Sequence, residues 1–405
     1  MKIWKLALVA GAALAFYLLL WPTGVEPVAW DAPLPPGPDT YPANDVLRHI
    51  QRIGAGVGLG PETVNVDAAG RVYTGYSDGR IVQLAPDGRT YMDLANTHGR
   101  PLGITFGPDG GLVIADAGRG LLALGRKISV LADRADDVPF GLTNDVDNTV
   151  MDKNVYFTDS TSKFAGTRYL DDLLEHGAHG RLMQYNVATG DTHVLLKDLH
   201  YANGVAVGPD DAYVLVSETS EYRVLRYWLK GDKAGTHDVF IDNLPGFPDN
   251  ISYNNRDRFW LALAAPRNPQ FDQLLSGHLF ERRLLSRLPS ALRPQPQRRA
   301  FVLGLDLNGK VIANLQYAGA DAYAPVTSVR EFGPWLYFGS LAERTIGRMP
   351  LHYAVASAPL PPSGWEKVPD SMQVPLPHSA ESDREEEEEE EAEQASKRAQ
   401  KRPPH

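Results

Sequence analysis

Four residues with side-chain oxygen atoms stand at the heads of apolar segments that have the composition of β-strands: Glu62, Asn144, Asn203 and Asp249. Carboxylate and amide oxygens are the ligands that hard divalent cations prefer in proteins. Two carboxylates that face each other would repel, and burying them ionised would be costly, unless a cation lies between them. A set of oxygen ligands without His or Cys suits Ca²⁺ best, and Mg²⁺ or Mn²⁺ less well. The alternative is that each residue only satisfies its own turn.

These residues occupy equivalent positions in an internal repeat. Each repeat has a head residue, an apolar strand, a turn and further short strands, and four of the six heads carry an oxygen ligand. The repeats begin at Glu62, Leu102, Asn144, Asn203, Asp249 and Thr327. The repeat predicts an all-β fold, a six-bladed β-propeller, rather than one or two β-sandwiches. The innermost strands of a propeller line its central channel, so the heads would form a ring around one axis. The run HIQRIGAG, residues 49–56, is the candidate outer strand that closes the last blade.

Two insertions, residues 163–180 and 267–299, interrupt the repeats. Both have the apolar spacing of short amphipathic helices, and both follow the second strand of a blade. We therefore expect two helical lids on one face of the disc, above a covered site. Their apolar residues indicate a hydrophobic substrate: Leu173, Leu174, Phe271, Leu274 and Leu275.

Other motifs in the chain do not predict a site. The run GYSDG (75–79) resembles a nucleophile elbow but lies between two strands, and GAGVGLG (54–60) lacks the βαβ unit of a dinucleotide-binding fold. We expect His200 to be a strand residue rather than a catalytic base. Asn250 begins a formal glycosylation sequon, but its register predicts that it points away from the ring and its position beside the proposed metal argues against glycosylation.

The N-terminus predicts a membrane segment. Lys2 and Lys5 precede an apolar run that ends near Trp21, so residues 1–21 are interpreted as an uncleaved signal-anchor, and a cleaved signal peptide is the alternative. Lysines before the span place the N-terminus in the cytoplasm and the bulk of the chain outside it, in the periplasm if the source is bacterial. Residues 22–44 are rich in Pro and predict a linker that lifts the domain off the membrane.

The charge of the chain is concentrated at its C-terminal end. The propeller is expected to span residues 45–356, and residues 357–405 contain an acidic block followed by a basic one, which is typical of a disordered tail. The net charge of −10 argues against a nucleic-acid partner. The absence of Cys among the 405 residues excludes disulfides and thiolate metal sites.

Several motifs in this order resemble one known family. The runs GPET, LTND, YFTDSTSKF, RLMQYNVATG, YANGVAV and GFPDNIS, within residues 45–352, are similar to the strictosidine synthase-like propellers. That family includes the adipocyte plasma membrane-associated proteins and is related to gluconolactonase, regucalcin, diisopropyl-fluorophosphatase and the paraoxonases. In the calcium-dependent relatives a Glu, two Asn and an Asp hold a catalytic cation, and the resemblance assigns these roles to Glu62, Asn144, Asn203 and Asp249.

The resemblance also bears on the reaction. Strictosidine synthase uses no metal and has an essential glutamate at the head of its last blade, where this chain has Thr327. We therefore expect a Ca²⁺-dependent esterase or lactonase, with Asp249 as general base and Glu62 as the second candidate. The substrate would be a small hydrophobic ester or lactone. The alternatives are a metal-stabilised binding propeller without turnover, and a strictosidine synthase-like lyase, which Thr327 disfavours.

Overall fold

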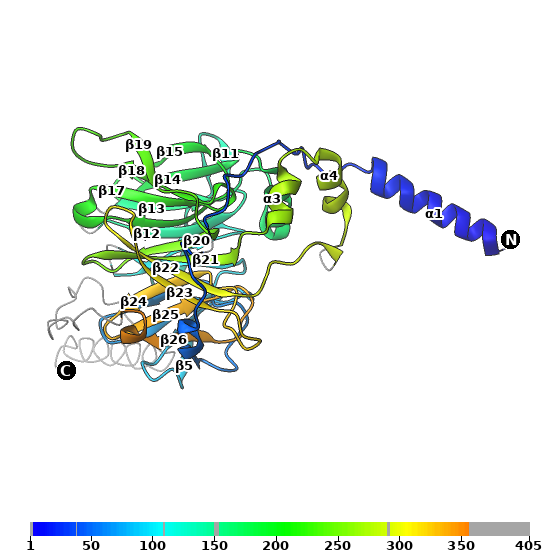
Figure 1. The fold of residues 1–405 in the computed structure, drawn as a ribbon. Helices are drawn as coiled ribbons and strands as arrows, with labels where there is room; N and C mark the ends of the chain where they lie inside the picture. The colour runs from blue at the N-terminus through cyan, green and yellow to red at the C-terminus, as the bar shows by residue number, and fades with distance from the viewer. Residues whose placement is uncertain (1–2, 38, 108–109, 150–153, 290–291, 356–405) are drawn as a thin grey trace, which may run out of the picture.

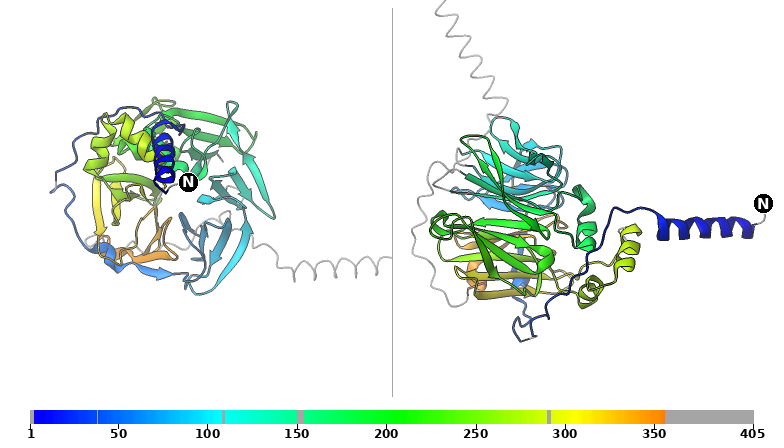
Figure 2. Two further views of the ribbon diagram at one scale, coloured as in Figure 1. Left: turned by 90° about the vertical axis from the view of Figure 1, so that its right-hand side faces the viewer. Right: turned by 90° about the horizontal axis from the view of Figure 1, so that it is seen from above.

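The structure is a computed structural model that describes residues 3–37, 39–107, 110–149, 154–289 and 292–355. Six four-stranded antiparallel sheets surround a common axis, which confirms the predicted six-bladed propeller (Figure 1; Figure 2, left). The predicted tail, residues 357–405, lies outside the described residues.

The first three blades run in order from the inner to the outer strand. Blade 1 contains β2 (Val64–Val66), β3 (Val72–Gly75), β4 (Arg80–Leu84) and β5 (Tyr91–Asn96). Blade 2 contains β6 (Pro101–Phe106), β7 (Leu112–Asp116), β8 (Gly120–Leu124) and β9 (Ile128–Ala132). Blade 3 contains β12 (Thr143–Asn148), β13 (Asn154–Asp159), β14 (Gly180–Asn186) and β15 (Thr192–Leu199). A small hairpin of β10 (Arg134–Ala135) and β11 (Val138–Pro139) separates blades 2 and 3.

The other blades complete the ring. Blade 4 contains β16 (Ala202–Val207), β17 (Tyr213–Glu218), β18 (Arg223–Trp228) and β19 (His237–Ile241). Blade 5 contains β20 (Gly246–Tyr253), β21 (Arg258–Pro266), β22 (Ala300–Asp306) and β23 (Val311–Tyr317). Blade 6 contains β24 (Ser328–Phe332), β25 (Trp335–Gly339), β26 (Ile346–Pro350) and, as its outer strand, β1 (Gln51–Ile53). The antiparallel pairing of β1 with β26 confirms that residues 49–56 provide the closing strand.

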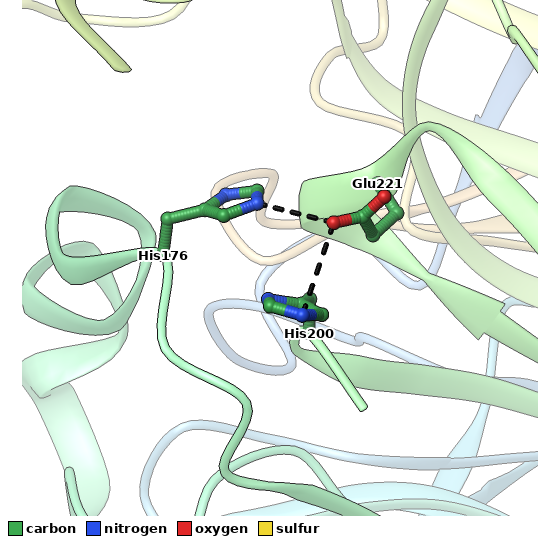
Figure 3. A group of neighbouring side chains, drawn as sticks. All are labelled: His176, His200 and Glu221. Atoms are coloured by element: carbon green, nitrogen blue, oxygen red, sulfur yellow. Dashed lines mark hydrogen bonds and ion pairs between the residues drawn. The ribbon is translucent and has the colours of Figure 1, made fainter. Parts of the chain in front are cut away.

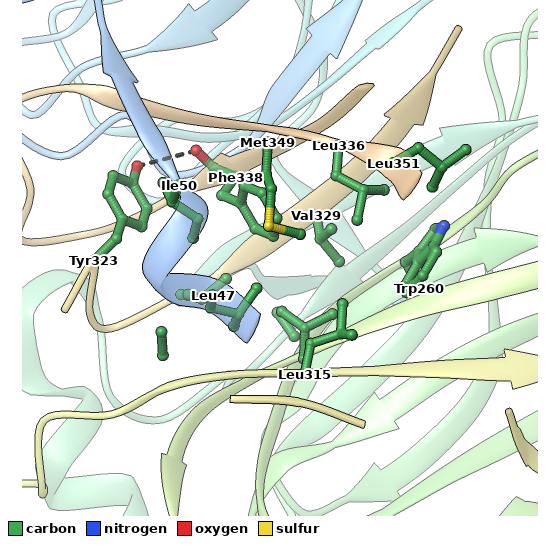
Figure 4. Close-up of a cluster of buried hydrophobic side chains, with 14 residues drawn as sticks. Leu47, Ile50, Trp260, Leu315, Tyr323, Val329, Leu336, Phe338, Met349 and Leu351 are labelled. Atoms are coloured by element: carbon green, nitrogen blue, oxygen red, sulfur yellow. Dashed lines mark hydrogen bonds between the residues drawn. The ribbon is translucent and has the colours of Figure 1, made fainter. Parts of the chain in front are cut away.

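Apolar side chains fill the spaces between adjacent blades. The cluster in Figure 4 joins blades 5 and 6, with Trp260 from β21, Leu315 from β23 and Leu336 from β25. Leu47, on the short helix η1 (Val46–His49), seals the cluster from outside. Because burial of one large apolar side chain contributes about 1.5–3 kcal/mol, each such seam holds neighbouring blades firmly. The ring is therefore a stiff support for side chains at its centre.

The inner strands are irregular near their heads. Register shifts lie between Thr143 and Val146 in β12, between Ala202 and Val205 in β16, and between Pro248 and Ile251 in β20. At each shift three steps along the inner strand oppose two on its partner, which is the signature of a β-bulge. A bulge interrupts the alternation of side chains, so consecutive residues can face the same side.

Three short helices lie on one face of the disc, as predicted. Helix α2 (Tyr169–Glu175) connects β13 to β14, and helices α3 (Pro269–Leu275) and α4 (Leu279–Arg287) connect β21 to β22. The Asn268 side chain caps α3 by accepting hydrogen bonds from the backbone N–H groups of Gln270 and Phe271. Figure 2, right, shows these helices on the side from which the N-terminal helix leaves.

The N-terminal helix α1 (Ile3–Leu20) is long and apolar enough to cross a membrane by length and composition. The segment that follows is not a free spacer, which corrects the expectation for residues 22–44. The backbone N–H of Val28 donates to the carbonyl of Glu175 at 2.8 Å, and that of Trp30 donates to Leu275 at 3.0 Å. Further along, the Pro33 carbonyl accepts a hydrogen bond from Arg267. The segment thus runs across the lid helices and down the side of blade 5.

Candidate functional site

The predicted residues lie at the heads of the inner strands, which contact their neighbours around the channel. Asn144, Asn203 and Asp249 belong to β12, β16 and β20, and Glu62 stands two residues before β2. All four side chains are buried, and Glu62 is only 2% exposed. The structure therefore places the four residues at the same end of the channel.

The two asparagines from neighbouring blades are held by the same device. Asn144 Nδ2 donates to Ser160 Oγ at 2.9 Å, and that hydroxyl donates to the carbonyl of Ala202 in the next blade at 2.7 Å. Asn203 Nδ2 donates to Thr219 Oγ1 at 3.1 Å, and that hydroxyl donates to the carbonyl of Pro248 at 2.7 Å. Each side-chain amide nitrogen is thus held by a hydrogen bond to a hydroxyl group, and the amide oxygen points away from that hydroxyl.

Asn250 belongs to this group, and the prediction that it points away from the ring is wrong. Its Nδ2 donates to Glu62 Oε1 at 3.1 Å and to Thr63 Oγ1 at 3.2 Å, so it links blade 5 to blade 1. The bulge between Pro248 and Ile251 is the reason, because it breaks the alternation on which the prediction depended. The burial of Asn250 agrees with the expectation that its sequon is not glycosylated.

Three amide oxygens at the channel have no hydrogen-bond donor among the residues that the structure describes: the Oδ1 atoms of Asn144, Asn203 and Asn250. A buried acceptor without a donor costs roughly 1–3 kcal/mol, and native proteins avoid it. Three such atoms at one end of one channel need a common explanation. A bound cation would satisfy them together.

The carboxyl groups at the channel are only partly compensated. Burial raises the pKa of Glu62 to about 7, although Arg100 and the hydrogen bonds from Thr63 and Asn250 lower it. Burial and the charge of Glu62 raise the pKa of Asp249 well above its ordinary value. Burial likewise raises the pKa of Asp145, next to Asn144, to about 8. At each of these groups burial outweighs the interactions that stabilise the negative charge.

The donor set fits a hard divalent cation. Carboxylates of Glu62 and Asp249 and amide oxygens of Asn144, Asn203 and Asn250 are all oxygen ligands, which is the chemistry that Ca²⁺ prefers over transition metals. A cation would lower the cost of keeping both carboxylates ionised and would give the three amide oxygens a partner. The residues present are therefore compatible with the predicted Ca²⁺ site.

The lid adds titratable groups that the sequence did not reveal. Asp172 of helix α2 is 1% exposed, and burial raises its pKa to about 7. Tyr201 lies close enough to feel the charges of Asp172, Asp249 and Glu62, which, together with its burial, raise the pKa of its phenol. Tyr201 also has a backbone φ of 61°, a strained value for an aromatic residue that is often found at functional sites.

Two other residues considered from the sequence have different positions. Thr327 is fully buried and donates from Oγ1 to the backbone carbonyl of Glu62 at 2.9 Å, so it fixes the backbone of a channel residue. His200 lies in the connection between β15 and β16 rather than within a strand. Its ring lies near that of His176 and the carboxylate of Glu221, and it stands three residues before Asn203 in the chain.

Comparisons with known proteins agree with this fold. Residues 39–84 match the family described as strictosidine synthase-like, N-terminal, and residues 144–232 match the strictosidine synthase family. Strictosidine synthase-like protein 4 of Arabidopsis thaliana is 36% identical over 315 residues, which cover 75% of this chain and 83% of that protein. The adipocyte plasma membrane-associated protein of Salmo salar is 33% identical over 350 residues, covering 80% and 83%.

Among solved structures, a gluconolactonase from Xanthomonas campestris has a TM-score of 0.53 at 15% identity, covering 82% of this chain and 98% of that one. A calcium-binding protein described as regucalcin, from Agrobacterium tumefaciens, has a TM-score of 0.51 at 16% identity, covering 76% and 93%. At such low identity these two show a common fold. The sequence relatives show more: this chain belongs to the family of strictosidine synthase-like and adipocyte plasma membrane-associated proteins.

Proposed function

We propose that this chain is a metal-dependent hydrolase of carboxylic esters or lactones, that its metal is Ca²⁺, and that it works at a membrane surface. The observation that carries the proposal is the set of three buried, unpartnered amide oxygens beside two buried carboxyl groups. If each residue only satisfied its own turn, there would be no reason for so many buried acceptors without donors at one place. A cation site on a rigid ring accounts for them.

The hydrogen bonds of the two carboxyl groups support different roles for them. Glu62 accepts from Asn250 at Oε1 and from Thr63 at Oε2, both at 3.1 Å, so both of its oxygens are held in place. Asp249 is stabilised by hydrogen bonds from Asn203 and from the backbone of Asn250. We assign Glu62 to cation binding and Asp249 to removal of a proton from the attacking water. A bound Ca²⁺ would polarise the ester carbonyl and stabilise negative charge on its oxygen.

The apolar residues of the lid helices support the proposal that the substrate is hydrophobic. Leu173, Phe271 and Leu274 are only half-buried and project from helices α2 and α3, on the face where the channel residues lie. Phe271 lies edge-on to Phe247 of β20, with ring centroids 6.0 Å apart. An apolar group would bury this surface on binding. The gluconolactonase neighbour adds lactones to the esters as candidate substrates.

Helix α1 supports the membrane location. Its hydropathy and length suit a single span, and the relatives include proteins described as plasma membrane-associated. We assign the N-terminus to the cytoplasmic side and the propeller to the opposite side, because Lys2 and Lys5 precede the span.

The experiment that tests the function is a chelation assay on the full-length chain in mild detergent. Hydrolysis of aryl esters and lactones would be measured before chelation, after chelation, and after adding back Ca²⁺, Mg²⁺ or Mn²⁺. We expect turnover to disappear with the chelator and to return with Ca²⁺. A propeller that hydrolyses no ester or lactone, and only melts at a lower temperature after chelation, would refute the enzyme and leave the metal-stabilised binding propeller.

A further inference from the structure

A second group of ligand-type side chains comprises His176, His200 and Glu221, none of which is among the predicted channel residues (Figure 3). His176 follows the last residue of α2 and takes a left-handed conformation with φ of 54°. His200 lies in the connection between β15 and β16, and Glu221 ends the short helix η4 (Thr219–Glu221) between β17 and β18. Three separate segments therefore bring their side chains to one point.

The two imidazole rings converge on one carboxylate oxygen. Glu221 Oε1 lies 3.1 Å from His176 Nε2 and 3.9 Å from His200 Nε2, and one ligand atom from each residue lies within 4.8 Å of the others. A tetrahedral zinc ion with bonds of about 2.0–2.1 Å separates its ligand atoms by about 3.3 Å. The observed spacing needs only small side-chain shifts to reach that geometry.

The surroundings hold the cluster in this arrangement. His176 is 1% exposed, and the indole of Trp30 stacks on its ring with centroids 4.4 Å apart. The rings of His176 and His200 lie 4.8 Å apart. Neither Nδ1 atom has a hydrogen-bond partner among the described residues. Burial and the proximity of His176 lower the pKa of His200, which keeps that imidazole in the neutral form that binds metals.

We propose that His176, His200 and Glu221 bind a divalent ion of the zinc class, with a water in the fourth position. Imidazole nitrogen suits Zn²⁺ and other late transition metals, whereas Ca²⁺ prefers the all-oxygen channel site, so the two sites select different ions. The ion would join the end of lid helix α2 to two loops of the propeller. It would thus act as a clasp that holds the lid closed.

The test uses the full-length chain in detergent, stripped of metal and then titrated with Zn²⁺ in the presence of excess Ca²⁺. We expect one equivalent of zinc to bind, and Co²⁺ to give the visible absorption of a tetrahedral site. His176→Gln and His200→Gln should each weaken zinc binding by at least about tenfold to a hundredfold, the range seen even for outer partners of metal ligands. His237→Gln, which changes an exposed histidine of β19, is the matched control and should bind zinc like the wild type.

A second measurement keeps the test valid if a buried histidine variant fails to fold. Glu221→Gln preserves size and removes only the anionic ligand, so it should also lose zinc affinity. In hydrogen-exchange mass spectrometry, zinc should slow exchange in residues 169–180 of the wild type and not of Glu221→Gln. Asp249→Asn should keep zinc binding, which separates this site from the channel. Failure of the wild type to bind zinc, or equal binding by the His176→Gln/His200→Gln double variant, would overturn the proposal.

Discussion

Asp249 and Glu62 are buried at the same end of the channel, but only Glu62 has both carboxylate oxygens held by side-chain hydrogen bonds. We therefore predict that Asp249→Asn lowers kcat for ester hydrolysis by about a hundredfold to ten-thousandfold, the usual contribution of a general base. Calcium affinity should fall less, because the amide keeps one oxygen ligand. The same change at an exposed acid of outer strand β5, Asp93→Asn, is the control. Equal activity of both variants would remove Asp249 from the mechanism.

The raised pKa values predict how pH and calcium act together on stability. Because the pKa of Glu62 is about 7 in the folded, metal-free protein, the folded state keeps protons that the unfolded chain releases above about pH 4.5. The free energy of unfolding of the metal-free protein should therefore fall as pH rises from about 4.5 to about 7, by on the order of 3 kcal/mol for this one group. Calcium should thus raise Tm more at about pH 8 than at about pH 5. A calcium effect of equal size at both pH values would contradict the site.

Individual residues of the channel were predictable only where the repeat aligns them. Glu62, Asn144, Asn203 and Asp249 share one position in their repeats, and the structure places them together. Asn250 was missed because the bulge in β20 lets neighbouring residues face the same side, and a bulge leaves no mark in the hydrophobic pattern. Asp172 and Tyr201 come from the lid and a loop, whose positions no alternation pattern describes.

At the scale of elements, Arg282 of helix α4 joins the lid into one unit. It is 0% exposed and donates to the carbonyls of Leu174 at 2.7 Å, Glu175 at 2.8 Å and Val28 at 2.8 Å. The charged group thus caps the C-terminal end of α2 and ties down the N-terminal segment. We predict that Arg282→Met, which keeps most of the volume, costs the lid about 1–3 kcal/mol for carbonyls left unpaired.

Hydrogen exchange and kinetics would check the Arg282→Met prediction. Exchange should accelerate in α2, α3 and residues 22–35 while the blades stay protected, and KM for hydrophobic esters should rise. The neighbouring Arg283→Met alters an exposed arginine of the same helix and should change neither. Uniform loss of protection throughout the propeller would show that the lid is not a separate unit.

The blades were predictable as elements because each repeat has the same strand and turn pattern. Their turns have clear causes: the Asp67 carboxylate accepts from the backbone N–H groups of Ala69 and Arg71, and Gly70 has a φ of 78°. The path of residues 22–44 was not predictable, since its contacts are backbone hydrogen bonds to lid helices far along the chain. A Pro-rich composition indicates extended chain but not the surface on which it lies.

The whole molecule combines an apolar helix and a lidded site on the same side. Tyr17 Oη donates to the carbonyl of Arg287 at 2.9 Å, and Arg287 Nε donates to the carbonyl of Trp21 at 2.8 Å, so the end of α1 is joined to α4. With α1 inserted in a bilayer, the lid face would be turned toward the lipid (Figure 1). An ester dissolved in the membrane would then meet the lid before any other part of the propeller.

Phe280 of α4 is 55% exposed on this face and tests the orientation. An exposed aromatic ring at a bilayer surface gains from burial among lipid headgroups, whereas a carboxylate there loses. We predict that Phe280→Glu, assayed in vesicles, lowers hydrolysis of a long-chain ester several-fold and leaves a short, water-soluble aryl ester unaffected. Val239→Glu introduces the same charge at an exposed position of β19 and should affect neither substrate. Both variants should remain in the vesicles, because α1 is intact in each. Equal rates on the long-chain ester for Phe280→Glu and Val239→Glu would mean that the lid face does not meet the membrane.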